Sequence, residues 1–335
     1  AVFKFNRSKN KIYLITSGAF IAYALLIKKN AVITVPVYLL YIWVATSYKR
    51  DRIKNMIFYI LPVILGIVIM FFVHYIIFGS ALKTEYGDIG AVFKKALPGH
   101  HLLKGLYYYM FSGGKSYFIY NIPLVLSLLG IRPFFKKHKN EAIFALAFVA
   151  VHLLFYAHIF KRGSIFSWGP RYLLPTVPFM IIFLAEYTDI ARTAIRRWVI
   201  GIFAAAGCIL QAPALLVSFT NYINCVKDSL HLDEYLINFV PDLSPVKGVW
   251  YLLISLLSRL TGGAGADFVF NPDYILIEQK IAPLKGYDNL DTWWANIIKV
   301  EPRLAPLAVI GATLICAVLL FCLWQLAGLS RKRKI

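Results

Sequence analysis

Charged residues are scarce in this sequence. Aspartate, glutamate, lysine and arginine make up 16% of its 335 residues, and only 16 residues are acidic. Soluble domains carry roughly a quarter charged residues, and 59% of this chain is hydrophobic. These two features exclude a soluble globular domain and predict an all-α, polytopic transmembrane protein. The net charge of +20 therefore has to be interpreted loop by loop, and we expect no nucleic-acid partner.

Cysteines are also few, and their spacing excludes the common cysteine chemistries. The four are Cys208, Cys225, Cys316 and Cys322. They show neither metal-ligand nor redox spacing, so we expect small core residues and no metal site. A nucleotide-binding phosphate loop is excluded as well. Gly113–Ser116 reads Gly-Gly-Lys-Ser, but Tyr109 stands where that pattern requires its first glycine.

Long apolar runs are abundant. A helix needs about 20 apolar residues to cross a bilayer, and this criterion predicts about eight spans. They are 12–27, 31–48, 56–78, 114–131, 141–160, 171–187, 198–219 and 304–327. The chain begins at Ala1 in a basic segment that is no signal peptide, so we expect it to be N-terminally truncated.

Basic clusters occupy every second connection between these runs. They lie near the residue numbers 4–11, 49–54, 132–139, 192–197 and 331–334. The positive-inside rule places all five in the cytoplasm. We therefore expect a multi-pass protein of the plasma (inner) membrane with both ends of this chain in the cytoplasm. The expected domains are a transmembrane domain with about seven spans (1–219), an extracytoplasmic cap (220–302), and a last span with a basic tail (303–335).

The expected cap differs from the rest of the chain in charge. Ten of the 16 acidic residues lie in 220–302. Val249–Leu260 is apolar but too short to cross a bilayer, so we expect it to lie on the membrane surface. The segment predicts a small outer cap made of helices.

Basic residues are frequent in the short outward connections, where few are expected. They are Lys28, Lys29, Lys83, Lys94, Lys95, Lys104, Lys115, Lys161, Arg162 and Arg171. Contact with anionic lipid headgroups is one explanation. Binding of a dedicated anionic ligand at the outer face is the other.

The segment GSIFSWGPRYLLPTVP (163–178) is the strongest candidate for that ligand site. Gly169-Pro170 ends the preceding helix, and Arg171 falls on the first turn of the next one. A guanidinium beside a helix N-terminus favours an anion. The alternative is that Trp168 and Arg171 anchor the helix at the membrane interface. Glu85 and Asp88, in LKTEYGD, are acid–base or metal-ligand candidates, or else a solvated loop face.

Three segments together resemble one known family. They are FFVHYIIFGSALKTEYG (71–87), YYYMFSGGKSYFIYNIPLVLSLLGI (107–131) and FSWGPRYLLPTVPF (166–179). The combination resembles the bacterial GT-C membrane glycosyltransferases, which use polyprenyl-phosphate sugars and are related to protein O-mannosyltransferases and aminoarabinose transferases. Ala81, Glu85 and Gly113 depart from the family pattern.

This resemblance implies transfer of a sugar from a polyprenyl phosphate to an acceptor at the outer membrane face. It implies no organic cofactor, is compatible with a divalent cation, and places the catalytic carboxylate in an earlier outer loop, which we expect upstream of this chain. The expected carrier-binding residues are Lys28, Lys29, Lys115, Lys161, Arg162, Trp168, Arg171 and Tyr172.

There are two alternatives. One is a transporter or flippase of lipid-linked sugars, which would use the same outer anion site; such folds show two matching halves, which are not found in this sequence, although an N-terminal truncation would hide the first half. The other is a non-catalytic membrane subunit.

Overall fold

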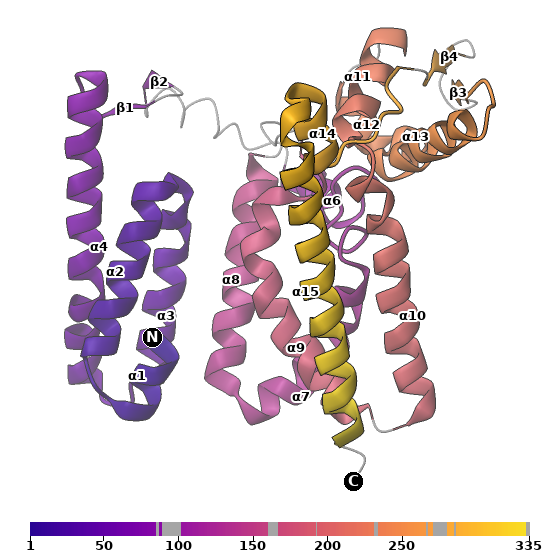
Figure 1. Cartoon of the computed structure of the whole chain (residues 1–335). Helices are drawn as coiled ribbons and strands as arrows, with labels where there is room; N and C mark the ends of the chain where they lie inside the picture. Colours follow the sequence, from indigo (N-terminus) through magenta and orange to yellow (C-terminus); the bar gives the residue numbers. More distant parts are fainter. Residues whose placement is uncertain are drawn as a thin grey trace. The chain divides into compact units, whose positions relative to one another are not determined.

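A computed structural model of the chain is nearly all-α (Figure 1). It describes residues 1–84, 87–88, 102–159, 167–191, 193–230, 234–265, 267–270, 280–284 and 286–332. The chain forms two compact units. The first comprises Ala1–Cys208 and Asn238–Pro241, and the second comprises Ile209–Ile237 and Asp242–Ile335.

The first unit contains most of the long helices. They are α1 (Val2–Ser8), α2 (Ile12–Ile27), α3 (Val35–Ala45), α4 (Lys49–Phe78), α6 (Leu102–Met110), α7 (Ser127–Lys137), α8 (Lys139–His158) and α9 (Val177–Ile190). The short 3-10 helices η1 (Lys29–Thr34), η2 (Ile122–Leu126) and η4 (Arg171–Thr176) precede α3, α7 and α9. A two-residue hairpin, β1 (Lys83–Thr84) with β2 (Gly87–Asp88), follows α4.

The second unit is built from several short helices, one long helix and one hairpin. Its helices are α11 (Phe219–Leu230), α12 (Glu234–Phe239), α13 (Pro245–Leu260), α14 (Trp293–Val300) and α15 (Ala305–Lys332), with η5 (Pro213–Leu215), η6 (Pro241–Leu243) and η7 (Pro302–Leu304). Helix α10 (Ala194–Gln211) leads into it, and the last residues of α12 belong to the first unit. Strands β3 (Asp267–Phe270) and β4 (Lys280–Pro283) pair antiparallel. We predicted a cap made of helices alone, and this hairpin corrects that prediction.

Four helical segments in the described part are long and apolar enough to cross a membrane. They are Lys49–Phe78, Lys139–His158, Arg171–Ile190 and Ala194–Leu215. Two shorter apolar helical segments, Ile12–Ile27 and Lys29–Ala45, coincide with predicted spans but are not long enough by the same measure. A third apolar segment, Pro302–Val318, leads into the 28-residue helix α15 and coincides with the last predicted span. A membrane-embedded protein is supported, and the count of about eight spans is not confirmed.

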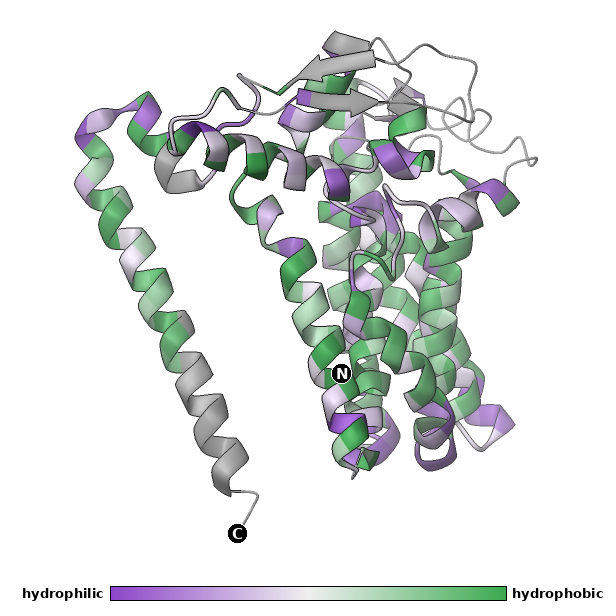
Figure 2. Cartoon of the chain, turned by 90° about the vertical axis from the view of Figure 1, so that its right-hand side faces the viewer, coloured by the Kyte–Doolittle hydropathy of each residue, from purple (hydrophilic) through white to green (hydrophobic). Residues whose placement is uncertain are grey.

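The outer surfaces of these helices are apolar, which favours contact with lipid over contact with water. On α4, Leu61, Leu65 and Phe72 are 58–62% exposed, and α10 buries none of its side chains. Large apolar surfaces of this kind are rare on soluble monomers. Figure 2 shows hydrophobic residues along the long helices and hydrophilic residues gathered at their ends. The cysteines, which we expected to be small core residues, follow this expectation only in part. Cys225 is buried, but Cys208 and Cys316 are exposed.

The predicted span 114–131 is wrong as a continuous helix. Residues 111–121 form a series of turns, and helical structure starts only at Ile122. Two adjacent glycines, Gly113 and Gly114, disfavour a helix there. Pro123 is suited to a first helical turn, where its missing N–H has no partner to lose. The apolar run is therefore divided into a packed loop and a short helix.

An aromatic core holds α3, α8 and α9 together. Phe144 of α8 is 2% exposed and contacts Tyr41 of α3 and Phe179 of α9, with ring centroids 5.4 and 5.6 Å apart. Edge-to-face contacts at these distances are favourable beyond the area they bury. Figure 1 shows α7, α8 and α9 side by side. This packing fixes the end of α8 and the start of η4, where the candidate site lies.

Candidate functional site

Arg171 begins η4 rather than an α-helix, which corrects our prediction for this turn. Pro175 has no N–H to donate to the carbonyl of residue 171, so an α-helical hydrogen bond cannot form at this point. Arg171–Thr176 winds instead as a 3-10 helix, and α9 continues from Val177. The hydroxyl of Thr176 donates to the carbonyl of Leu173 at 2.6 Å. This tight first turn leaves Arg171 exposed.

Two cations lie on the ring of Tyr172. The ammonium of Lys28 is 5.1 Å from the ring centroid, and the guanidinium carbon of Arg171 is 5.2 Å from it. Both distances are within the range of cation–π attraction. Arg171 Nη2 also donates to the Tyr172 hydroxyl at 3.4 Å. No carboxylate among the described residues forms an ion pair with either cation.

Tyr172 is held in place by a second aromatic ring. Tyr156, one turn before the end of α8, stacks on it with centroids 4.9 Å apart and planes 16° apart. The Tyr156 hydroxyl in turn accepts a hydrogen bond from Asn30 Nδ2 at 3.2 Å. Asn30 lies in η1, two residues after Lys28. The segments carrying Lys28, Tyr156 and Tyr172 are thus joined at one point.

Lys115 approaches this group from the 111–121 loop. It is only 3% exposed. Its ammonium donates to the carbonyl of Ser167 and, at 3.1 Å, to the Ser167 hydroxyl. Burial and the positive charge of Arg171 lower the pKa of Lys115 from 10.5 to about 7. Lys115 is therefore close enough to Arg171 for the two charges to interact, and its own charge is variable near neutral pH.

The backbone of the 113–116 segment does not form an anion cradle. Gly114 N–H donates to the carbonyl of Asn238 at 3.2 Å, and Lys115 N–H donates to the Ser112 hydroxyl at 3.2 Å. Ser116 N–H donates to the carbonyl of Ser112 at 3.0 Å. These three N–H groups are used inside the protein and are not available to a ligand. A Cβ on Gly114 would lie 2.6 Å from Asn238 Cα, so only glycine fits there.

Trp168 and Gly169 complete the entry to η4. Trp168 packs edge-on against Tyr120, with ring centroids 4.9 Å apart. Gly169 has a φ of +59°, and a Cβ there would lie 2.7 Å from the Tyr120 ring. Glycine is required by both the backbone angle and the space. Tyr120 thus fixes the chain direction immediately before Arg171.

The remaining predicted residues lie elsewhere or outside the described part. Lys29 begins η1 beside Lys28. Asp88 is exposed on β2, where its backbone pairs with that of Lys83. Glu85, Lys161 and Arg162 lie outside the described residues. In the described ranges no three His, Cys, Asp or Glu side chains are grouped as a metal site would require.

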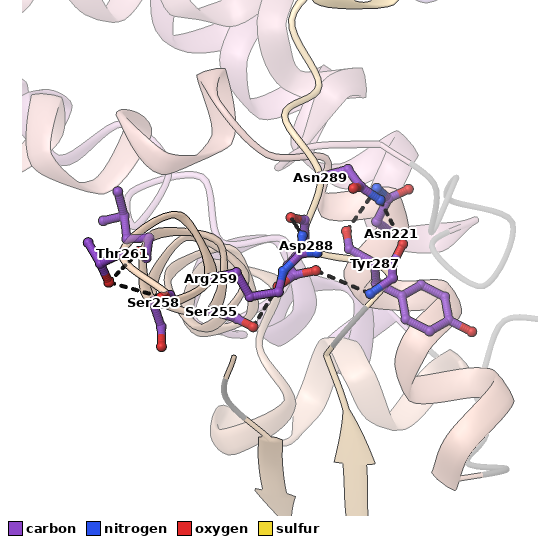
Figure 3. Close-up of polar contacts among 10 residues, drawn as sticks. Asn221, Ser255, Ser258, Arg259, Thr261, Tyr287, Asp288 and Asn289 are labelled. Atoms are coloured by element: carbon purple, nitrogen blue, oxygen red, sulfur yellow. Dashed lines mark hydrogen bonds and ion pairs between the residues drawn. The ribbon is translucent and has the colours of Figure 1, made fainter. Parts of the chain in front are cut away.

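One buried acid in the second unit was missed in the sequence and has a different role. Asp288 is fully buried, and its carboxylate accepts hydrogen bonds from Arg259 Nε at 2.8 Å, Ser255 Oγ at 2.6 Å and Gly286 N–H at 3.2 Å (Figure 3). Arg259 Nη2 also donates to the Asp288 carbonyl at 2.9 Å. With its oxygens engaged in this way, Asp288 fixes a loop against α13 and is a poor candidate for a general base.

Four further residues of the site could not be identified from the sequence. Tyr156 and Asn30 carry no motif, Ser167 lies in the 163–178 segment but was not singled out there, and Asn238 is 124 positions beyond Gly114. The neighbouring Phe239 stacks on Tyr107 of α6, with centroids 6.1 Å apart and planes 11° apart. Only the fold brings these side chains to the 111–121 loop and η4.

Comparison of the chain with family models, with curated proteins and with solved structures gives no match. The function has to be argued from the residues and their geometry.

Proposed function

We propose that this chain is part of a membrane glycosyltransferase that moves a sugar from a polyprenyl-phosphate carrier to an acceptor at the outer face of the plasma membrane. The observation that carries the proposal is the group formed by Lys28, Lys115, Arg171 and Tyr172. Segments far apart in the sequence bring Lys28 and Arg171 onto one tyrosine ring, and Lys115 contacts Ser167, four residues before Arg171. No described carboxylate is ion-paired with Lys28 or Arg171.

The position of this group suits a lipid-linked phosphate. Arg171 begins a helical segment long enough to cross the membrane, and Tyr156 lies near the end of another. A lipid carrier places its phosphate at this depth and its chain along the apolar helices. Arg171 and Lys28 would bind the phosphate, and their charge would stabilise the negative charge that develops on it as the leaving group.

Replacement of Arg171 by lysine tests the role of this residue. The planar guanidinium makes two parallel hydrogen bonds to a phosphate, which an ammonium cannot reproduce. We expect Arg171→Lys to reduce sugar transfer roughly a hundredfold without changing expression or thermal stability. The matched control is Arg196→Lys on α10, which changes an exposed arginine outside this group and should keep its transfer rate.

Transfer is measured as release of polyprenyl phosphate from polyprenyl-phosphate-linked hexoses and pentoses, in membranes of cells that make the full-length enzyme of which this chain is a part. Near-normal transfer by Arg171→Lys would show that Arg171 only anchors its helix at the membrane interface. A donor that crosses the bilayer unchanged, and only when the protein is present, would support a transporter instead.

A further inference from the structure

Two exposed cations share the ring of Tyr172. Lys28 Nζ and the guanidinium carbon of Arg171 are 5.1 and 5.2 Å from its centroid. The ring attracts each cation, but the two like charges repel each other. Both side chains are long and flexible, so the ring by itself does not fix where their charges lie. Their positions must be held by the residues around the ring.

Tyr156 is the one residue that reaches the supports of both cations. It is 4% exposed, and its ring stacks on that of Tyr172 with centroids 4.9 Å apart and planes 16° apart. Its hydroxyl accepts a hydrogen bond from Asn30 Nδ2 at 3.2 Å. Asn30 and Lys28 belong to one tight turn, because the N–H of Ala31 donates to the carbonyl of Lys28 at 2.9 Å. A single buried side chain thus joins α8 to both η1 and η4.

The segments on either side of this contact are firmly packed. A Cβ on Gly105 of α6 would lie 2.7 Å from the Cα of Ala157, which follows Tyr156, so the two helices touch through their backbones. On η4, the buried hydroxyls of Thr176 and Tyr117 are hydrogen-bonded at 2.9 Å. Tyr156 therefore transmits the position of a fixed part of α8 and does not move with the exposed side chains.

We propose that Tyr156 is a positioning residue of the anion site. Its hydroxyl holds Lys28 through Asn30, and its ring holds Arg171 through Tyr172. Both cations are then in place before a phosphate binds, which reduces the entropy lost on binding. Because Tyr156 is buried, it acts through these neighbours and not by contact with the phosphate. The inference rests on the proposed function, since it takes the anion to be a lipid phosphate.

A double-mutant cycle tests the action of the hydroxyl on Lys28. The chain, in neutral detergent, is titrated with decyl phosphate by calorimetry, and thermal stability is measured alongside. Tyr156→Phe keeps the stacked ring and removes the hydroxyl, so we expect about fivefold weaker binding, the order of one hydrogen bond. In a Lys28→Met background the same substitution should have no further effect. In an Arg171→Met background it should keep its full effect.

The action of the ring on Arg171 is tested with a smaller side chain. Tyr156→Leu removes both the hydroxyl and the stacking partner of Tyr172. It should weaken binding more than Tyr156→Phe does in the otherwise wild-type chain. In the Arg171→Met background the two substitutions should be equal, because the ring then has no cation left to position.

A matched control removes a buried tyrosine hydroxyl elsewhere in the same unit. Tyr41 on α3 is 1% exposed, and its hydroxyl donates to Glu141 at 3.4 Å. Tyr41→Phe should leave decyl phosphate binding unchanged. If it weakens binding as much as Tyr156→Phe, the effect is a general loosening of the unit and the inference is refuted.

The outcomes separate this inference from the function on which it rests. A wild-type chain that does not bind decyl phosphate overturns both. Wild-type affinity in Tyr156→Phe, or an equal loss in the wild-type and Lys28→Met backgrounds, overturns the role of Tyr156 and leaves the anion site in place. If Tyr156→Phe fails to fold, Asn30→Ala takes its place in the cycle, because it removes the donor of the same hydrogen bond.

Discussion

The two units each contain a deeply buried ionisable side chain, and the two side chains have different hydrogen-bond partners. In the second unit, the Asp288 carboxylate faces the guanidinium of Arg259 and two further donors. In the first unit, the Lys115 ammonium donates to the carbonyl and the hydroxyl of Ser167, and burial lowers its pKa to about 7. A buried charge beside an opposite charge fixes a structure, whereas a buried lysine with a lowered pKa can change its charge near neutral pH.

The largest effect should follow from breaking the opposite-charge pair. Removing one partner of a buried pair leaves the other desolvated and commonly costs about 3 kcal/mol or more. Asp288→Asn should therefore destabilise the loop that it holds against α13. Opening of this unit can be followed by labelling Cys225, which is fully buried on α11, after the other cysteines are replaced by serine. We expect labelling about a hundredfold faster.

The control is the same Asp→Asn substitution at an aspartate that is exposed. Asp228 is exposed, and its carboxylate accepts a hydrogen bond from the Tyr287 hydroxyl at 2.8 Å. Asp228→Asn should change Cys225 labelling by less than a few-fold. Similar rates for the two variants would show that the Asp288 pair does not determine the stability of this region.

A pH-dependent effect is expected at Lys115. Its pKa is lowered from 10.5 to about 7 in the folded protein, so between these values the unfolded chain binds more protons. Stability then rises with pH across this window, and below pH 7 the penalty of the buried ammonium is complete and constant. Without an anion, wild type should gain thermal stability relative to Lys115→Met from pH 7 to 9.5. Parallel profiles for the two proteins would show that Lys115 does not titrate in the folded state.

The sequence predicts the positions of the exposed cations Lys28 and Arg171 better than the contacts of the buried Lys115. Lys28 and Arg171 lie at the ends of apolar runs, where a basic residue must face the membrane surface, and both belong to the site. The ammonium of Lys115 contacts Ser167, and the neighbouring Gly114 contacts Asn238; no sequence pattern links these pairs. Tyr156 illustrates the same limit, because a tyrosine near a helix end is ordinary and only its stacking on Tyr172 gives it a role.

Some elements of the fold were predicted from the sequence and others were not. Ile12–Ile27 is a helix with the predicted ends, because one apolar run is bounded by Lys11 and Lys28. The run 114–131 is as apolar but begins with a packed loop, since hydropathy does not report backbone conformation. The β3–β4 hairpin was also missed. Its strands are four residues each, too short for the alternation of side chains to be distinctive.

The smallest effect is expected at an ion pair that looks stronger than the one at Asp288. Lys247 Nζ lies 2.6 Å from Asp242 Oδ1, against 2.8 Å for Arg259 and Asp288. Yet the Lys247 and Asp242 side chains are 48% and 50% exposed, whereas Asp288 is fully buried. Water and salt screen an exposed pair, which typically contributes less than 1 kcal/mol.

Lys247→Ala should therefore change the free energy of opening, measured by Cys225 labelling, by less than about 1 kcal/mol, and the change should shrink in high salt. Asp288→Asn should keep most of its effect in the same salt, because no solvent reaches the carboxylate. A loss in Lys247→Ala as large as that in Asp288→Asn would mean that distance, and not burial, sets the strength of these pairs.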